Sequence, residues 1–359
     1  MTLQPSQPVS SAPHAAEWND YSFVVQMPHL APGEKLSEVE FLKLLAAYQW
    51  ESIARALHRR PSEIVSEHGE RLYGSVLDTE LCLADGYDLE RLGEDAEIHV
   101  RSRVRFFAKK FVEGFFVIDD APIPDALLAG VERRADLPGT GRCWAAMTNV
   151  FIARAGGNLR LKVYKPAGTE ALELAELVAP PFGVTEQARV QQTGEIDALD
   201  ESDARAVPLR PTDDAPIRYT IVPESDLNGA GLVYFARYEA MMNYGERRFL
   251  MERLGRPLSR ELVAHLSTEH RKVFFFANTS PDDEVEIYVS AALLGREHFS
   301  APPASRGLRV PFKLLFRIDL HRGSDKQLMA SSLVRKALHV PGGLKAVLAE
   351  CERLFARLG

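Results

Sequence analysis

Residues 217–255 read IRYTIVPESDLNGAGLVYFARYEAMMNYGERRFLMERLG and contain the pattern that decides the fold. The first six residues form an apolar run typical of a strand, a glycine turn follows at residues 229–231, and a helix is predicted over residues 233–254. Gly255 and Pro257 end this helix because neither residue continues one readily. The residues at helical spacing on its apolar face are Tyr234, Tyr238, Met241, Met242 and Phe249.

The first half of the chain has the same order of elements. Residues 21–27 (YSFVVQM) predict a strand, and residues 37–59 predict a helix in which Ser37 and Glu40 have the spacing of a capping box. A shift of 196 residues superposes the two patterns without a gap. The chain is therefore predicted to contain two copies of one unit.

Several long strands follow each helix. The run of alternating residues from Val310 to Leu320 is typical of an antiparallel strand with one face on a core. One strand, one long helix and a run of antiparallel strands indicate an α+β fold, not an alternating βαβ sheet. A long helix wrapped by a curved antiparallel β-sheet is the hot-dog arrangement, so we predict a double hot-dog. The other predicted strands cover residues 72–83, 96–106, 111–119, 144–154, 159–164, 272–278, 284–294 and 327–338.

The composition also predicts the limits of the two units. Residues 1–20 form a Pro/Ser-rich tail that we expect to be disordered, residues 21–166 form the N-terminal hot-dog domain, and residues 217–359 form the C-terminal one, ending in an amphipathic helix at 344–358. Residues 167–216 are rich in Pro, Asp, Glu and Ala and predict an exposed linker with one short helix near residues 170–178. The alternative is a long loop inside one domain.

Charge and composition exclude several classes of protein. The 359 residues carry a net charge of −7, with 43 Lys and Arg against 50 Asp and Glu, which argues against binding to nucleic acid. No apolar run approaches the length of a membrane span, and no signal peptide is recognisable, so we expect a cytoplasmic protein. The spacing of Cys82, Cys143 and Cys351 supports neither a disulfide framework nor a metal site.

The loop before the second helix contains the polar residues that indicate chemistry. Asp226, Asn228, Gly229 and Gly231 crowd one turn, where glycines let a ligand approach the backbone. The amides near Gly231 and Leu232, with the Asn228 side chain, would stabilise the oxyanion of a thioester. The alternative is a glycine-rich helix cap without a ligand. Asn278, at the end of a strand, is a further candidate for binding substrate, or is simply a turn residue.

This loop resembles the active-site segment of 4-hydroxybenzoyl-CoA thioesterase relatives, which are hot-dog proteins with the pattern D-x-D-x-x-G-[IV]-V-Y followed by A-x-Y. The family's catalytic aspartate falls on Asn228, and an amide can neither act as a general base nor as a nucleophile. The resemblance therefore implies an acyl-CoA pocket, with Asp226 and Tyr234 binding substrate, but not the usual hydrolysis. The matching residues are Asp226, Gly231, Val233, Tyr234, Ala236 and Tyr238.

A closer resemblance covers about residues 21–338. The phrases MPHL, LSE and RLY in the first half and DLNGAGLVYFA in the second resemble the leinamycin-type (LnmK-like) bifunctional acyltransferase/decarboxylases, which are double hot-dog proteins of polyketide biosynthesis. The resemblance implies that methylmalonyl-CoA loses CO2 and that propionyl passes to an acyl carrier protein. It also implies a tyrosine nucleophile, which is Tyr73 by position. His29 is our candidate for the neighbour that activates it.

Two other functions stay open. One is an acyl-CoA thioesterase that uses a different carboxylate, such as Asp226 or Glu246. The other is a non-catalytic module that binds an acyl carrier protein, for which Arg101, Arg103, Arg105, Lys109 and Lys110 could form the docking face or simply the solvated side of a strand. In every case the expected partners are an acyl-CoA or an acyl carrier protein, with a possible homodimer, no bound cofactor, no nucleic acid and no membrane.

Overall fold

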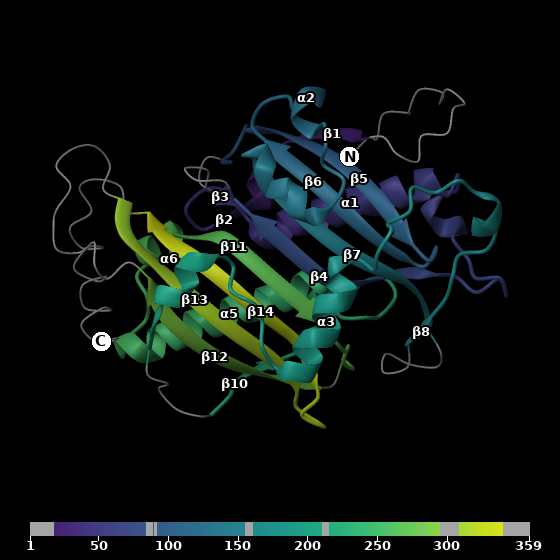
Figure 1. Ribbon diagram of the computed structural model, residues 1–359. Coiled ribbons are helices and arrows are strands. Elements are labelled where there is room, and N and C mark those ends of the chain that lie inside the picture. The colour runs from purple at the N-terminus through teal and green to yellow at the C-terminus, as the bar shows by residue number, and fades with distance from the viewer. Residues whose placement is uncertain are drawn as a thin grey trace.

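The computed structural model describes residues 18–83, 89, 92–154, 161–209, 215–281, 283–294 and 309–339 (Figure 1). Most of the predicted N-terminal tail and the whole of the predicted helix at 344–358 lie outside these residues. In the first half, the structure contains β1 (Asn19–Val24), β2 (Leu30–Ala31), β3 (Lys35–Leu36), α1 (Glu38–Ala56), β4 (Tyr73–Cys82), β5 (Glu97–Phe107), β6 (Phe111–Asp119), α2 (Asp125–Leu128), β7 (Cys143–Arg154) and β8 (Leu161–Val163). Later come α3 (Phe182–Thr193), β9 (Val207–Pro208), β10 (Ile217–Thr220), α4 (Pro223–Asp226), α5 (Phe235–Leu254), α6 (Arg260–His265), β11 (Leu266–Phe275), β12 (Glu284–Leu294), β13 (Arg309–Arg322) and β14 (Leu328–His339).

One antiparallel sheet runs through both halves of the chain. Its strand order is β1-β5-β6-β7-β4-β11-β14-β13-β12-β10, with β8 paired to β7 and β9 paired to β12. The halves meet where β4 pairs with β11, in a register that places Asp78 opposite Phe274 and Cys82 opposite His270. The order within the second half repeats that of the first, so the sheet is two copies of one unit joined at this seam.

The two long helices pack on one face of the sheet. Helix α1 contacts β5 and β6, helix α5 contacts β12 and β13, and the two helices contact each other. In Figure 1 both lie behind the sheet, and a single hydrophobic core from both halves fills the space between. The Ser37 hydroxyl accepts a hydrogen bond from the Glu40 backbone N–H, which is one half of the predicted capping box of α1. The other half is not formed, because the Ser37 N–H donates to the His29 carbonyl (2.8 Å). Each half therefore has the arrangement of a hot-dog unit.

Burial along the strands follows the predicted alternation. In β13 the side chains of Leu314, Phe316, Ile318 and Leu320 are buried, and the residues between them are partly exposed. Strand β12 has the predicted bounds, but β11 begins six residues earlier than predicted. Helix α6, which was not predicted, precedes it. The prediction began the strand at its most hydrophobic part, Lys272–Asn278, and assigned no element to the polar residues before it.

The segment predicted as a linker is more ordered than its composition indicates. No α-helix forms over residues 170–178. A short 3-10 helix covers Thr169–Ala171, and beyond it Phe106 donates a backbone hydrogen bond to Ala175 (2.7 Å) and accepts one from Leu177 (2.6 Å). Instead, α3 crosses the sheet face opposite α1 and α5 and contacts β4, β7 and β11 (Figure 1). Helix α3 therefore covers the seam between the halves, and these tertiary contacts provide burial that the polar sequence does not show.

Beneath α3 lies a cluster of buried charges. Arg134 is paired with Asp78, lies 3.0 Å from a Glu113 carboxylate oxygen, and stacks on the Phe182 ring at 4.7 Å. Across the seam, His270 Nε2 lies 2.9 Å from a Glu80 carboxylate oxygen. Buried charges are tolerated only when they are paired, so this cluster requires the two halves and α3 to be assembled together.

Candidate functional site

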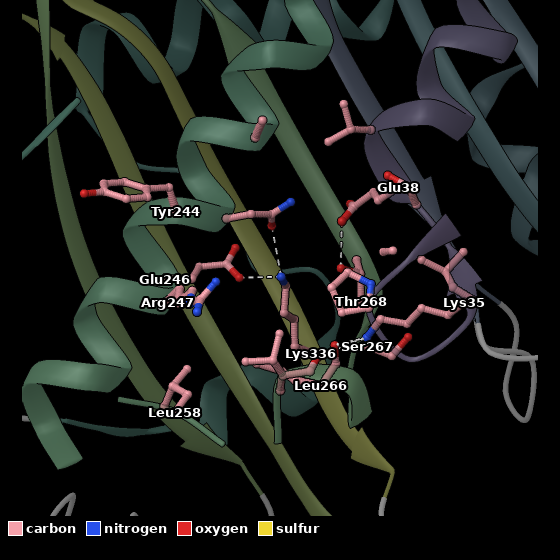
Figure 2. A pocket seen from close by; sticks show the side chains of 18 of the residues that line it. Lys35, Glu38, Tyr244, Glu246, Arg247, Leu258, Leu266, Ser267, Thr268 and Lys336 are labelled. Atoms are coloured by element: carbon pink, nitrogen blue, oxygen red, sulfur yellow. Dashed lines mark hydrogen bonds and ion pairs between the residues drawn. The ribbon is translucent and has the colours of Figure 1, made fainter. Parts of the chain in front are cut away.

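A cavity of about 390 Å³ lies at the start of α1, between that helix, α5 and strand β11 (Figure 2). It is therefore built from both halves of the chain. Much of its wall is apolar and suits the acyl part of a ligand. The apolar lining residues are Ala31, Pro32, Leu36, Val39, Leu89, Ala240, Leu250, Leu258, Leu262, Val263 and Leu266.

The rest of the lining is polar, and part of it forms a network of hydrogen bonds and ion pairs. Figure 2 shows Glu246 of α5 and Lys336 of β14 pointing toward each other, and these two side chains form an ion pair. Asn243 Oδ1 accepts hydrogen bonds from Lys336 Nζ (3.0 Å) and from Arg271 (2.8 Å). Arg271 also lies 3.2 Å from a Glu246 carboxylate oxygen. The cavity therefore places a carboxylate, an amide and a cation side by side.

Glu38, at the start of α1, continues this network on the other side of the cavity. It accepts hydrogen bonds from Arg271 Nε (2.7 Å) and from the Thr268 hydroxyl (2.9 Å). Burial alone would raise the pKa of Glu38, but Arg271 and then Lys336 outweigh it, so the pKa lies below its usual range. Burial and the Glu38 charge instead raise the pKa of Glu239 far above its usual range, which keeps that carboxyl neutral.

Hydrogen-bond donors also remain available at this cavity. Asn243 uses its oxygen for two cationic donors, and among the described residues its Nδ2 group has no acceptor. The first backbone N–H groups of α1, at Glu38 and Val39, have no partner within the helix, and both residues line the cavity. The Ser267 hydroxyl is buried in the wall and has no hydrogen-bond partner among the described residues. Such donors can polarise the carbonyl of a bound thioester.

The loop predicted to bind the thioester is closed by its own hydrogen bonds. Asn228 Oδ1 accepts from the backbone N–H groups of Ala230 (2.9 Å) and Leu232 (3.1 Å). The N–H of Gly231 donates to the Asn228 carbonyl (2.8 Å). The amides expected to form an oxyanion hole are thus already bonded within the loop, while Gly229 is exposed. All of these donors and acceptors belong to residues 228–232, so local contacts close the loop.

Asp226 and Asn278 hold this loop in place. Asn278 Oδ1 accepts from the Val233 N–H (3.1 Å), and its Nδ2 donates to the Val233 carbonyl (3.3 Å). Asp226 is fully buried and accepts hydrogen bonds from Arg237 Nε (2.9 Å) and from the Tyr219 hydroxyl (3.1 Å). These contacts use the groups that were predicted to meet substrate, so the structure gives both side chains a positioning role in the loop.

We expect Asp226→Asn to lower the free energy of unfolding by roughly 2 kcal/mol, since it removes one partner of a partly buried ion pair. Burial raises the Asp226 pKa, but hydrogen bonds from the Val222 N–H, Arg237 and Tyr219 together hold it below its usual value. The stabilisation is therefore present above the unfolded-state pKa and is lost as pH falls through the lower folded-state pKa. Urea unfolding between pH 7 and pH 3 measures this. A difference between wild type and variant that does not shrink in acid would contradict it.

The structure brings Tyr73 close to the loop, but it places His29 elsewhere. Tyr73 packs against a cluster that contains Ala230 and Leu232, with Arg71 at 5.4 Å from the ring centre. The His29 ring instead accepts a hydrogen bond from the Gln26 N–H (3.1 Å) in the turn before α1. No contact joins His29 to Tyr73 among the described residues. His29 therefore lies in the turn before α1, and no contact among the described residues supports its predicted role as the neighbour that activates Tyr73.

Tyr234 links the loop to the first half. Burial, and then the charge of Glu40, raise the pKa of Tyr234 to about 12, so its phenol stays neutral at physiological pH. This favours a packing role for the ring over an ionised one.

The residues that the sequence reasoning missed lie on α5 and on the strands beside it. Of the polar network only Glu246 was considered, as a candidate carboxylate for thioester hydrolysis. A usable signal was present, because Glu239, Asn243 and Glu246 recur at spacings of four and three on the buried side of a predicted helix. Polar residues repeated on an otherwise apolar helix face indicate a buried network or a site. Thr268 and Lys336 had no comparable signal, because strand pairing alone makes them neighbours.

No protein-family model matches the chain, and no curated protein is similar to it in sequence. Among solved structures, one described as an oleoyl thioesterase from Lactobacillus plantarum is similar over 90% of this chain and 98% of its own, with 10% identity and a TM-score of 0.52. This chain has the double hot-dog fold. Two other solved structures match this double hot-dog chain with lower TM-scores. An acyl-ACP thioesterase from Bacteroides thetaiotaomicron matches at 12% identity over 89% and 97% of the chains (0.49), and a 12:0-ACP thioesterase from Umbellularia californica at 10% over 89% and 97% (0.47).

No described helix is long and apolar enough to cross a membrane. Within the same residues, no three His, Cys, Asp or Glu side chains are grouped so that they could hold a metal ion.

Proposed function

We propose that this double hot-dog protein processes acyl thioesters, and that it hydrolyses them in the cavity at the start of α1. The observation that carries this proposal is the buried Glu246 carboxylate, which lies beside Lys336 and Asn243 in a largely apolar cavity. The similar structure from Lactobacillus plantarum is described as a thioesterase, which supports the same class of chemistry by analogy of fold.

The residues around the cavity can be given roles in such a reaction. The apolar wall holds the acyl group, and the N–H groups at the start of α1 with Asn243 Nδ2 polarise the thioester carbonyl. Glu246 takes a proton from water as the water oxygen attacks the carbonyl carbon. The carbon–sulfur bond then breaks, and the departing thiolate takes up that proton, so that a free acid and a thiol are formed. Arg271 and Lys336 position the carboxylate through their ion pairs.

A panel of acyl-CoA substrates, assayed for free thiol and for the free acid, tests this function. Stoichiometric release of both products without any carrier protein is the expected result. Binding of acyl-CoA with no turnover across the panel would contradict it and favour a non-catalytic binding module.

A second candidate is the acyltransferase/decarboxylase chemistry of the leinamycin-type family. The observation that favours it is the packing of Tyr73 beside the 228–232 loop. In this reaction the Tyr73 oxygen attacks the (methyl)malonyl thioester and releases CoA, CO2 leaves the acyl group, and the remaining acetyl or propionyl group passes to the phosphopantetheine thiol of an acyl carrier protein. The carrier protein, a homodimer and a cytoplasmic location stay predictions from the sequence.

Tyr73→Phe separates the two candidates. If Tyr73 is the nucleophile, mass spectrometry of wild type with methylmalonyl-CoA shows an acylated Tyr73 peptide and CO2 release, and the variant loses both by a factor of a hundred or more, about 3 kcal/mol in the barrier. If hydrolysis in the cavity is the activity, thiol release by the variant stays within about threefold of wild type, since Tyr73 does not line the cavity. An unacylated, fully active wild type would rule out the second candidate.

A further inference from the structure

An arginine-rich surface adjoins the cavity, although the chain as a whole is acidic. Between residues 247 and 260 there are five arginines and one glutamate, in a chain with a net charge of −7. This segment covers the end of α5, the turn after it and the first residue of α6. It is therefore a local concentration of positive charge where the chain average predicts the opposite.

Two of these arginines are exposed and have no carboxylate partner. Arg247 and Arg260 form no hydrogen bond or ion pair with any residue in the described part of the chain, whereas Arg248 lies 3.7 Å from Glu252. Unpaired guanidinium groups are strong, geometrically specific ligands for phosphate.

The other basic stretch of the molecule is different. Arg101 lies 2.6 Å from a carboxylate oxygen of Asp20 and 2.8 Å from one of Asp125, and Arg103 and Arg105 both pair with Glu132. The three arginines of the face suggested by the sequence for docking a carrier are thus paired with carboxylates. Arg247 and Arg260 have no such partner among the described residues.

The unpaired arginines stand at the cavity. Arg247 is itself a lining residue, and Arg260 begins the helix whose Leu262 and Val263 line the same cavity. Figure 2 shows Arg247 on α5 next to Glu246. In coenzyme A a flexible pantetheine arm separates the thioester from three phosphate groups, so a thioester held in the cavity leaves its phosphates outside, among these arginines.

We propose that Arg247 and Arg260 bind the phosphate groups of coenzyme A, so that the thioester substrate of this protein is an acyl-CoA. This proposal rests on the proposed function in one respect only, namely that the thioester occupies the cavity at the start of α1. A small phosphate-bearing ligand matches the charge because Arg247 lines that cavity and Arg260 begins the short helix whose Leu262 and Val263 line it. Binding of coenzyme A would account for this local positive charge in an acidic chain without requiring a second protein.

The test compares wild type with the Arg247→Ala/Arg260→Ala double variant. Isothermal titration with coenzyme A is expected to show an affinity about tenfold weaker in the double variant and a smaller dependence on salt. In turnover, the ratio of kcat/KM for acyl-CoA to kcat/KM for the corresponding acyl-pantetheine, which lacks phosphates, should fall about tenfold. Arg247→Lys/Arg260→Lys keeps the charge and should recover most of the affinity.

Arg218→Ala is the matched control. Arg218 is an exposed arginine on β10 whose nearest carboxylate oxygen, on Glu284, is 3.8 Å away, and it does not line the cavity. Unchanged affinity for coenzyme A in the double variant, or an effect equal to that of Arg218→Ala, would overturn the proposal. An effect confined to an acyl carrier protein substrate would also overturn it and assign the surface to a protein partner. Because titration with coenzyme A needs no turnover, loss of the proposed hydrolysis and loss of this binding site can be told apart.

Discussion

Glu246→Gln is expected to lower kcat/KM for acyl-CoA hydrolysis by a factor of at least about 100, the usual contribution of a positioned general base. The substitution keeps the size of the side chain and an oxygen that can accept a hydrogen bond from Lys336, but it removes the group that takes the proton from water. KM should change little, because the apolar wall that holds the acyl group is untouched. Steady-state kinetics with one acyl-CoA from the panel measures both constants.

Helix α1 offers the control for this variant. Glu51→Gln removes a carboxylate that is about half exposed, pairs with Arg55 and does not line the cavity, so its kinetics should match those of wild type. Circular dichroism checks the fold of each variant, since Glu246→Gln leaves Lys336 without its carboxylate. If that variant does not fold, Glu246→Asp keeps the ion pair and tests the geometry. A folded Glu246→Gln that retains more than half of the wild-type kcat/KM would assign the chemistry to another group.

Gly183→Ala should lower the free energy of unfolding by roughly 3 kcal/mol, because it forces a methyl group into a filled site beside buried charges. A Cβ atom at Gly183 would overlap the Asp78 carboxylate and lie 2.5 Å from the Thr148 hydroxyl oxygen. Asp78 cannot move aside easily, since it is buried and paired with Arg134. The variant must displace α3 from the sheet or break that pair. Urea unfolding monitored by fluorescence measures the loss.

Gly139→Ala is the matched control for this effect. No atom lies within 4 Å of a Cβ built at Gly139, and its backbone does not have a positive φ. We therefore expect a change within about 0.5 kcal/mol for a substitution of the same size. Equal stability of the two variants would contradict the close packing of Gly183 in α3 against Asp78 and Thr148 at the seam.

Local sequence patterns predicted most of the fold. The cap at Ser37, the alternation in β13 and the matched order of elements in the two halves all depend on residues close together in the chain, and each is found in the structure. The connector was the exception. Only the contacts of α3 with the seam show which side of this helix is buried. In the sequence, its composition therefore resembles that of an exposed linker.

The candidate site, like the fold, was predicted only in part from the sequence. From sequence, the glycine-rich loop before α5 was the strongest candidate, and in the structure its own hydrogen bonds occupy the amides expected to meet the thioester. Asn228 closes the loop on itself, and Ala230 and Leu232 are buried with Val150 and Ile152. The cavity lies at the corresponding end of α1, where the sequence had shown a helix cap and the phrase LSE but no expected binding site for the thioester.

By itself, the sequence determined that this chain is two α+β units of one kind, because helical and strand periodicities are local properties of the chain. The position of the cavity between the two units depends on tertiary packing. Lys336 and Thr268 become neighbours through the pairing of β11 with β14, and Glu38 reaches Arg271 across the contact between the halves. Contacts between residues separated by tens to hundreds of positions depend on how the helices and the sheet pack together, and no local periodicity records that packing.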